Sequence, residues 1–480
     1  MSPRKTKIVA TIGPSSNQRN TLKNLIEAGM DVARINFSHG TYEQHAATIT
    51  VLRELSTQLG KPICILQDLQ GPKSRLGNLP SEGVKLEKGQ FVRLSKVYPY
   101  LHSMDMLTLP ADIPNSRLIP PGSRVLIDDG RIELETIESN DQYVDTKVMV
   151  GGIVTSHKGL NFPGANLDIP CLTEKDLSDL RFGLEHNVDV IAVSFVRVAT
   201  DIIRVRQTIS DIDPKKSKIP VIAKLERPEA IENLRDILTV SDGVMVARGD
   251  LAVETSPAMV PIIQKQIIRS AKRQTKYVIT ATQMLESMVS NPRPTRAEAS
   301  DVANAIFDGT DAVMLSAETA IGKYPVESIQ IMHRIIEESE SHFCDWGLCD
   351  TEKDQPVQDD AISITRAARE LAHDRNVAAI AVFTQTGRTA LLMSKARPEV
   401  PILAFTPEKT TYQLLNMYWG VTPYMVPYAN TVEKMILEVE NCIATMRKIK
   451  KGQQVVIISG FPVGTFRPPN FALLHTIGQT

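Results

Sequence analysis

The sequence predicts an α/β protein with a closed (β/α)8 barrel, a small β-barrel lid inserted into that barrel, and a C-terminal open α/β domain. Apolar runs of strand length alternate with helix-patterned stretches, which is typical of parallel βαβ units. One interval between such runs is too long for a helix and carries alternating β patterns instead. The βα alternation resumes after a polar, acidic stretch, which indicates a further domain.

Eight apolar runs rich in Val and Ile have the length of strands that are buried on both faces. They are Lys7–Ile12, Val32–Phe37, Ile63–Asp68, Val188–Phe195, Pro220–Leu225, Gly243–Ala247, Tyr277–Ala281 and Ala312–Leu315. Between them lie the helical patterns Thr21–Ala28, Tyr42–Gln58, Glu174–Glu185, Asp201–Ile209, Pro228–Leu238, Pro257–Gln274 and Arg296–Phe307. Eight such units favour a closed barrel over the alternative, a doubly wound open sheet.

The interval between the third and fourth runs predicts the lid. Residues 72–170 carry short alternating β runs, separated by Gly, Pro and Asp-Asp-Gly turns. The barrel then comprises residues 1–71 and 171–343, and the C-terminal domain comprises residues 344–480. The C-terminal domain begins with an acidic linker, residues 345–360, and continues with strands at 378–384, 401–406, 421–426 and 455–460.

Composition excludes several classes of protein. The chain has 54 Lys and Arg against 55 Asp and Glu, so it lacks the basic charge that nucleic acids or acidic membranes attract. Its five cysteines are scattered and form no CxxC pair, which argues against a zinc ribbon and fits a reducing compartment. No apolar run reaches the length of a membrane span or a signal-peptide core. We expect a cytoplasmic protein with no nucleic-acid or membrane partner.

Polar side chains gather at the carboxyl ends of the predicted strands, where barrel enzymes hold their active sites. Residues two apart on a strand share a face. In chain order the residues are Arg34, Asn36, Ser38, Asp68, Lys224, Glu226, Arg248, Gly249, Asp250, Thr280, Thr282, Ser316 and Glu318. Each set alone is more often an ordinary ion pair or turn, but their convergence at one mouth predicts an active site.

The residue types at this mouth indicate chemistry on a small polyanion. Glu226 and Asp250 offer hard oxygen ligands for Mg²⁺. Lys224 is a point charge suited to a developing oxyanion, while Arg34 and Arg75 can fork onto phosphate oxygens. Phosphoryl transfer and enolate chemistry both fit this set. The P-loop and protein-kinase motifs are absent from the sequence.

Eight strings in this chain resemble motifs of the pyruvate kinase family. They are TKIVATIGPSS, ARINFSHG, DLQGPKSR, KLER, MVARGDL, ATQMLESM, NPRPTRAE and DGTDAVMLSAETAIGKYP, in this order between residues 6 and 325. The resemblance implies the last step of glycolysis, in which phosphoenolpyruvate phosphorylates ADP to give pyruvate and ATP. It also implies a homotetramer. The match is to bacterial-type members, which lack the N-terminal extension of many eukaryotic ones.

The resemblance also implies roles for the residues at the mouth. Glu226 and Asp250 would hold Mg²⁺ or Mn²⁺, and the backbone of Gly249 and Asp250 would bind the substrate carboxylate. Lys224 would stabilise the transferring phosphoryl group and the enolate oxygen, and Arg34 would contact phosphate. The other matching positions are Thr282, Ser316 and Glu318 beside the enolate, with the proton donor left open, and His39, Arg75 and Lys158 on the nucleotide side.

The chain departs from the family at its monovalent-cation site. The family site corresponds to Asn36, Ser38, Asp68 and Leu69. Many members continue as Asp-Thr-Lys-Gly-Pro-Glu, where this chain has Asp-Leu-Gln-Gly-Pro-Lys. Lys73 thus replaces a glutamate, and its ammonium could supply the charge that K⁺ otherwise brings, so we expect no requirement for K⁺. The alternative is that Lys73 points to solvent at the lid hinge.

A loop in the C-terminal domain predicts an effector site. The string TQTGRT precedes a predicted helix and offers a phosphate cradle. Its candidate residues are Thr384, Thr386, Gly387, Arg388 and Thr389. The family binds sugar phosphates or nucleotides in this region, so we expect allosteric regulation by a small phosphorylated effector, which the sequence does not identify. The alternative is a plain βα loop.

Two other functions compete with phosphoryl transfer to ADP. A Mg²⁺-dependent lyase or aldolase that forms an enolate would need no nucleotide, and would leave Arg75 and Lys158 unexplained. A scaffold protein that kept the fold without catalysis could lose Lys224 or Asp250, yet both are present. Formation of ATP from phosphoenolpyruvate and ADP distinguishes all three.

Overall fold

The computed structural model describes residues 4–97, 99–102, 106–113, 115–165, 169–347, 359–446, 449–463 and 467–479. Eight parallel strands close into a barrel, so the predicted TIM-type (β/α)8 fold is confirmed and the open-sheet alternative is wrong. In barrel order the strands are β1 (Lys7–Ile12), β2 (Val32–Asn36), β3 (Cys64–Asp68), β14 (Val190–Val193), β15 (Val221–Leu225), β16 (Gly243–Ala247), β17 (Tyr277–Ala281) and β18 (Ala312–Leu315).

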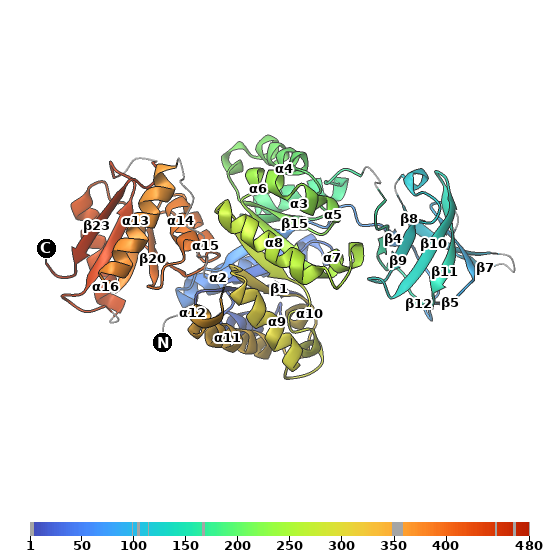
Figure 1. The fold of residues 1–480 in the computed structure, drawn as a ribbon, viewed down its shortest axis with the longest axis horizontal. Coiled ribbons are helices and arrows are strands. Elements are labelled where there is room, and N and C mark those ends of the chain that lie inside the picture. Colours follow the sequence, from blue (N-terminus) through green and yellow to red (C-terminus); the bar gives the residue numbers. More distant parts are fainter. Residues whose placement is uncertain are drawn as a thin grey trace.

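Helices surround the barrel strands (Figure 1). They are α1 (Arg19–Ala28), α2 (Tyr42–Leu59), α3 (Glu174–Glu185), α4 (Ala199–Ile212), α5 (Pro228–Glu232), α6 (Leu234–Val240), α7 (Arg248–Glu254), α8 (Val260–Arg273), α9 (Arg296–Phe307), α10 (Ala317–Ala320), α11 (Pro325–Ser341) and α12 (Phe343–Trp346). Thr41 begins α2 with a capping box, in which its hydroxyl accepts from the Gln44 backbone and the Gln44 side chain accepts in return. Thr173 and Thr295 start α3 and α9 in the same way.

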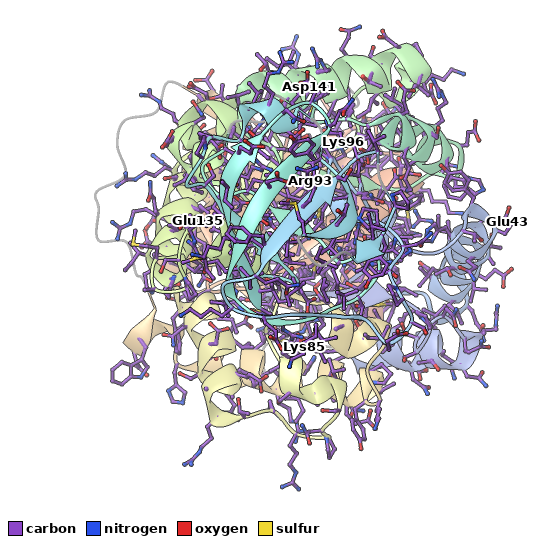
Figure 2. All side chains as sticks on the ribbon, turned by 90° about the vertical axis from the view of Figure 1, so that its right-hand side faces the viewer. Glu43, Lys85, Arg93, Lys96, Glu135 and Asp141 are labelled. Carbon is purple, nitrogen blue, oxygen red and sulfur yellow. The ribbon has the colours of Figure 1, made fainter. Side chains whose placement is uncertain are left out.

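The lid is made of strands between β3 and β14. They are β4 (Arg75–Leu76), β5 (Val84–Leu86), β6 (Phe91–Ser95), β7 (Leu101–His102), β8 (Leu107–Asp112), β9 (Arg124–Ile127), β10 (Ile132–Ser139), β11 (Tyr143–Val150), β12 (Gly152–Val154) and β13 (Leu160–Asn161). Strands β5 and β12 pair as an antiparallel two-stranded sheet, and the others form one larger sheet. Figure 2 looks onto this sheet, marked by Arg93, and shows it in front of the barrel.

The C-terminal domain is an open α/β sheet, as predicted. Its elements are α13 (Asp360–Asp374), β19 (Ala379–Phe383), α14 (Arg388–Ala396), β20 (Ile402–Thr406), α15 (Lys409–Leu415), β21 (Val421–Met425), α16 (Val432–Met446), β22 (Gln454–Ser459) and β23 (Phe471–Thr476). The strand order is β21-β20-β19-β22-β23, with β23 antiparallel and not predicted from the sequence. Most of the predicted linker, residues 348–358, lies outside the described residues.

The C-terminal domain packs against the base of the barrel, so the lid and this domain lie on opposite sides of it (Figure 1). One apolar cluster runs through both units, from Val9 and Met245 in the barrel to Met393 and Leu415 in the C-terminal domain. Buried charges cross the same boundary, because Lys395 and Arg397 both pair with Asp311 at the foot of β18. No helix in the described part of the chain is long and apolar enough to cross a membrane.

Candidate active site

Lys224 is at the centre of the polar groups at the barrel mouth. Its ammonium lies 3.0 Å from Glu226, 3.2 Å from Asp68 and 2.7 Å from the hydroxyl of Ser194. The alternation along β15 places Lys224 and Glu226 on one face, as the sequence predicted. Burial lowers the pKa of Lys224, but the charges of Asp68 and Glu226 outweigh this and raise it above the usual value. Lys224 therefore carries a permanent positive charge at neutral pH.

Arg34 and Asp68 form a second buried pair beside Lys224. The Arg34 Nε donates to Asp68 at 2.6 Å, and a terminal nitrogen donates to the Thr11 hydroxyl at 2.9 Å. Burial raises the pKa of Asp68, but Lys224 and Arg34 together hold it below its usual range. Asp68 is thus an anion that holds Lys224 and Arg34 side by side at the barrel mouth.

Glu226 and Asp250 lie close enough for their charges to interact. One oxygen of Glu226 accepts from the Phe195 backbone N–H at 2.8 Å, and the other faces Lys224. Burial raises the pKa of Glu226, Lys224 opposes the rise, and the charge of Asp250 adds to it. The two carboxylates therefore repel each other, and a divalent cation would relieve that repulsion. The donor set fits a hard metal ion.

Lys73 meets this carboxylate pair from the start of the lid. Its ammonium lies 3.1 Å from Asp250, and both side chains are mostly buried. A Cβ on Gly159 of the lid would lie 2.9 Å from the Lys73 Cε, so the stem of Lys73 passes directly under that glycine. The alternative in which Lys73 points to solvent does not match this position. The sequence did not reveal that Asp250 would be its partner.

The sequence predicts a Gly249-Asp250 turn that precedes a helix. Both residues lie instead inside the first turn of α7, which begins at Arg248, so that prediction is wrong. The Gly249 N–H donates to the Thr282 hydroxyl at 2.8 Å and is therefore not free. Thr282 itself has a positive φ of 70°, an uncommon backbone for a β-branched residue. Arg248 holds this backbone, donating to the Thr282 carbonyl at 2.8 Å.

Ser316 and Glu318 follow β18 as predicted, and Glu318 is committed to the backbone. Its two oxygens accept from the N–H groups of Ser316, at 2.7 Å, and Leu285, at 3.0 Å. This ties the end of β18 to the loop after β17. The Ser316 hydroxyl is buried and has no hydrogen-bond partner within the described structure.

The four positions of the family's monovalent-cation site lie together at the ends of β2 and β3. Asn36 accepts from the Ser38 backbone N–H at 3.2 Å. The Leu69 carbonyl accepts from the Ser194 hydroxyl at 2.7 Å, and the Leu69 side chain belongs to the barrel core. Asp68, at the end of β3, faces the cations Arg34 and Lys224.

The nucleotide-side candidates lie on both sides of the lid entrance. Arg75 donates to the His157 carbonyl at 3.1 Å, and Lys158 pairs with Asp128 at 2.7 Å, so both are held by lid residues. His39 lies beyond β2, and its pKa is lowered by burial and by the nearby charges of Arg75 and Arg34. His39 is therefore neutral at physiological pH and stands close to guanidinium groups.

The candidate effector loop borders a cavity of about 290 Å³. Four of its five predicted residues line that cavity, namely Thr384, Thr386, Arg388 and Thr389. Gly387 has a φ of 87° and starts α14, and its N–H donates to the Thr384 hydroxyl at 2.9 Å. Arg467 reaches the same cavity from the segment before β23, which the sequence did not indicate.

Sequence reasoning missed Ser194 and Thr11. The Ser194 hydroxyl accepts a hydrogen bond from the Lys224 ammonium and donates one to the Leu69 carbonyl. These two bonds link the ends of β14, β15 and β3. It is the polar residue that follows the apolar run VIAV, so the signal used for the other strands would have found it. Thr11 lies within a strand and had no such signal.

The mouth sets fixed positive charge beside carboxylates that can hold a metal ion, an arrangement suited to moving a phosphoryl group. The fold and this site define the class of TIM-barrel phosphotransferases. The chain belongs to the pyruvate kinase family. It matches the family models "Pyruvate kinase, barrel domain" over residues 3–329 and "Pyruvate kinase, alpha/beta domain" over residues 362–475.

Relatives and a solved structure agree over nearly the whole chain. A pyruvate kinase of Agrobacterium vitis is 43% identical, covering 97% of this chain and 96% of its own. One of Mycobacterium tuberculosis is 40% identical, covering 99% of both. The crystal structure of a pyruvate kinase from Cryptosporidium parvum is 34% identical, with a TM-score of 0.89, covering 99% of this chain and 96% of its own. The chain is a bacterial-type phosphotransferase that converts phosphoenolpyruvate and ADP into pyruvate and ATP, and its family needs a divalent metal ion.

Proposed function

We propose that this transfer takes place at the carboxyl ends of the barrel strands, with Lys224 as the central catalytic residue. The observation that carries the proposal is the position of its ammonium, 3.0 Å from Glu226 and 3.2 Å from Asp68 in a mostly buried site. A fixed charge in a buried site stabilises developing negative charge more than the same charge in water.

The reaction breaks the bond between phosphorus and the enol oxygen while an oxygen of ADP bonds to the phosphorus. Lys224 and Arg34 would contact the phosphoryl oxygens and the enolate that remains, and Asp68 keeps both cations in place. Glu226 and Asp250 would hold Mg²⁺ or Mn²⁺, which supplies further positive charge for the phosphate oxygens when bound. For this, Lys73 must release Asp250 or share it with the ion.

The substrate carboxylate and the enolate carbon would lie toward α7 and the loop after β17. The Gly249 and Asp250 backbone would receive the carboxylate, for which the Gly249 N–H must give up its bond to the Thr282 hydroxyl. Thr282 would lie beside the carbon that takes the proton. Glu318 would act through position, since both of its oxygens hold backbone N–H groups. Ser316 keeps a free hydroxyl near this point, and the identity of the proton donor stays open.

ADP would enter between the barrel and the lid, with His39, Arg75 and Lys158 around its phosphates. The test is a coupled assay that measures pyruvate and ATP together in wild type, Arg75→Ala and Lys158→Ala. We expect equal amounts of both products. In both variants the KM for ADP should rise relative to wild type, and it should rise more than the KM for phosphoenolpyruvate. Pyruvate without ATP would favour the lyase alternative, and an unchanged KM for ADP would overturn the assignment of the lid residues.

We expect the enzyme not to need K⁺. Both oxygens of Asp68 face protein cations, and the Leu69 carbonyl is bonded to Ser194, which supports the prediction. Lys73 adds a positive charge at Asp250. Initial rates with KCl, with NaCl at equal ionic strength, and without either salt test this. K⁺ activation above about tenfold, or about 1.4 kcal/mol, would overturn it.

The reciprocal variant is Lys73→Glu, with Lys73→Met as the matched control for loss of the charge alone. Lys73→Glu restores the residue found in many family members, so we expect lower activity without K⁺ and partial recovery when K⁺ is added. Lys73→Met should lose activity without gaining a response to K⁺. Equal responses in the two variants would show that the acidic residue does not decide K⁺ dependence.

We also propose that the cavity beside Thr384–Thr389 binds a small phosphorylated effector. Its hydroxyls, the N-terminal turn of α14 and Arg388 suit a phosphate group. Initial rates with a panel of sugar phosphates and nucleotides, in wild type and Thr384→Ala, test this proposal. A wild-type rate that responds to no member of the panel would count against it.

The remaining sequence predictions stay proposals. They are the domain limits of 1–71 with 171–343, 72–170 and 344–480, a homotetramer, and a cytoplasmic location. The sheet assignments support the limits, since the lid strands in the described part of the chain lie between Arg75 and Asn161. Family membership supports the assembly and the location. Analytical ultracentrifugation and limited proteolysis would test the assembly and the limits.

A further inference from the structure

A second cavity, of about 380 Å³, lies between the base of the barrel and the C-terminal domain. It is next to the candidate effector cavity, because Lys218, Thr386 and Arg388 line both. In Figure 1, α14 and α15 lie between the C-terminal sheet and the barrel, and both helices contribute to its wall. The two cavities therefore form neighbouring parts of one region that crosses the domain boundary.

Lys218 is a barrel residue that lines both cavities. It lies between the short 3-10 helix Pro214–Lys216 and the first residue of β15. Among the described residues that line the effector cavity, Lys218 alone comes from the barrel. Its ammonium makes no hydrogen bond or ion pair with any residue in the described part of the chain.

The charges around Lys218 leave an excess of positive charge. Lys276 and Arg388 also line the interdomain cavity, where the two carboxylates are already committed. Asp242 pairs with Arg206 at 2.6 Å. Asp359 caps the N-terminus of α13 and meets Arg388 at 3.4 Å. A small anion could therefore pair with the Lys218 ammonium without breaking an existing ion pair.

The cavity also touches the feet of three catalytic strands. Its lining includes Ile222 on β15, Asp242 before β16 and Tyr277 on β17. The opposite ends of these strands carry Lys224 with Glu226, then Asp250, then Thr282. Each strand has five residues, a span of about 16 Å at 3.3 Å per residue. A displacement of these strands at the cavity would therefore be transmitted over a short distance to the barrel mouth.

We infer that an anionic group of the effector pairs with the Lys218 ammonium. One phosphorylated ligand would then contact the barrel and the C-terminal domain together. This inference rests on the proposed effector function and adds the barrel as a partner in it. The ligand class is a small phosphorylated metabolite, with its phosphate shared between Arg388 on α14 and Lys218. Binding would then fix the position of the segment that leads into β15.

Calorimetric titration of the full-length protein with fructose 1,6-bisphosphate, ribose 5-phosphate and inorganic phosphate tests this inference. The variants are Lys218→Ala, Arg388→Ala and, as the matched control, Lys215→Ala, which removes an exposed lysine that lines neither cavity. We expect Lys218→Ala to weaken the binding of at least one probe about tenfold or more and to remove its effect on rate. The kcat without probe should stay unchanged, and Lys215→Ala should behave as wild type.

The outcomes separate this inference from the function on which it rests. If Arg388→Ala loses binding while Lys218→Ala binds and responds as wild type, the inference is wrong and the effector site stands. If Lys215→Ala weakens binding as much as Lys218→Ala, a diffuse surface charge explains the effect and the inference is overturned. If no probe binds wild type or changes its rate, both the effector site and the inference fail.

Discussion

Lys224→Met removes the ammonium at the barrel mouth and keeps most of the side-chain volume. In the wild type this ammonium faces Asp68, Glu226 and Ser194 within 3.2 Å. Losing one preorganised electrostatic group typically costs about 10²–10³ in kcat, or about 2.7–4 kcal/mol of barrier. The charges of Asp68 and Glu226 raise the pKa of Lys224 despite its burial, so we expect the same loss throughout neutral pH.

The substitution also has a cost in stability. Asp68 keeps Arg34 at 2.6 Å, whereas Glu226 is left with the Phe195 backbone N–H. Removing one partner of a buried ion pair typically costs about 3–5 kcal/mol of folding free energy. The double variant Lys224→Met with Glu226→Gln should recover much of that stability, because the unpaired charge is gone, and should recover no activity.

The assay measures kcat and KM by pyruvate formation, with phosphoenolpyruvate binding by calorimetry and urea unfolding as the control for folding. A folded single variant with kcat within about threefold of wild type, less than 1 kcal/mol of barrier, would refute the role of Lys224. Activity regained in the double variant would show that the loss came from the unpaired carboxylate and not from the missing ammonium.

Three further predictions concern other parts of the chain. Glu226→Gln and Asp250→Asn each remove a negative ligand charge, so each should raise the Mg²⁺ concentration for half-maximal activity; unchanged values in both would refute the metal site. Burial, against the pull of Asp311, lowers the pKa of Lys395 to about 8 from 10.5. Between these two pH values Lys395 binds more protons in the unfolded chain than in the folded protein. Its contribution to the free energy of unfolding should therefore rise with pH, by up to about 1.4 kcal/mol per pH unit. The urea midpoint of Lys395→Met should lack this rise, and a parallel rise in both proteins would contradict it. In Gly243→Ala, the new Cβ would lie 2.6 Å from a carbonyl of the neighbouring strand, so we expect a loss of about 1–3 kcal/mol in urea unfolding, and a wild-type midpoint would contradict this.

The barrel strands were predictable because strands buried on both faces are predominantly apolar runs rich in Val and Ile. The predicted run Val188–Phe195 contains β14 at Val190–Val193, with polar or turn residues at its ends. Strand β23 was missed because its pattern, FALLHT, neither alternates nor is wholly apolar, and its residues are partly exposed at the edge of the sheet.

Side-chain contacts at the site were predictable from the sequence where both residues lie on one strand. They were not predictable where the contact joins distant loops. The two-residue period placed Lys224 and Glu226 on one face, and their side chains meet at 3.0 Å. No local pattern relates Lys73 to Asp250, since the contact joins the lid entrance to a helix far along the chain. The same holds for Glu318, whose backbone partner Leu285 belongs to another loop.

The lid enters and leaves the barrel at neighbouring strands. β3 and β14 pair directly, with Leu66 opposite Val190 and Asp68 opposite Ala192, although these partners lie 124 positions apart in the sequence. The insertion therefore leaves the pairing of β3 with β14 intact. In evolution the length and surface of the lid could therefore change while the barrel strands keep their pairing register.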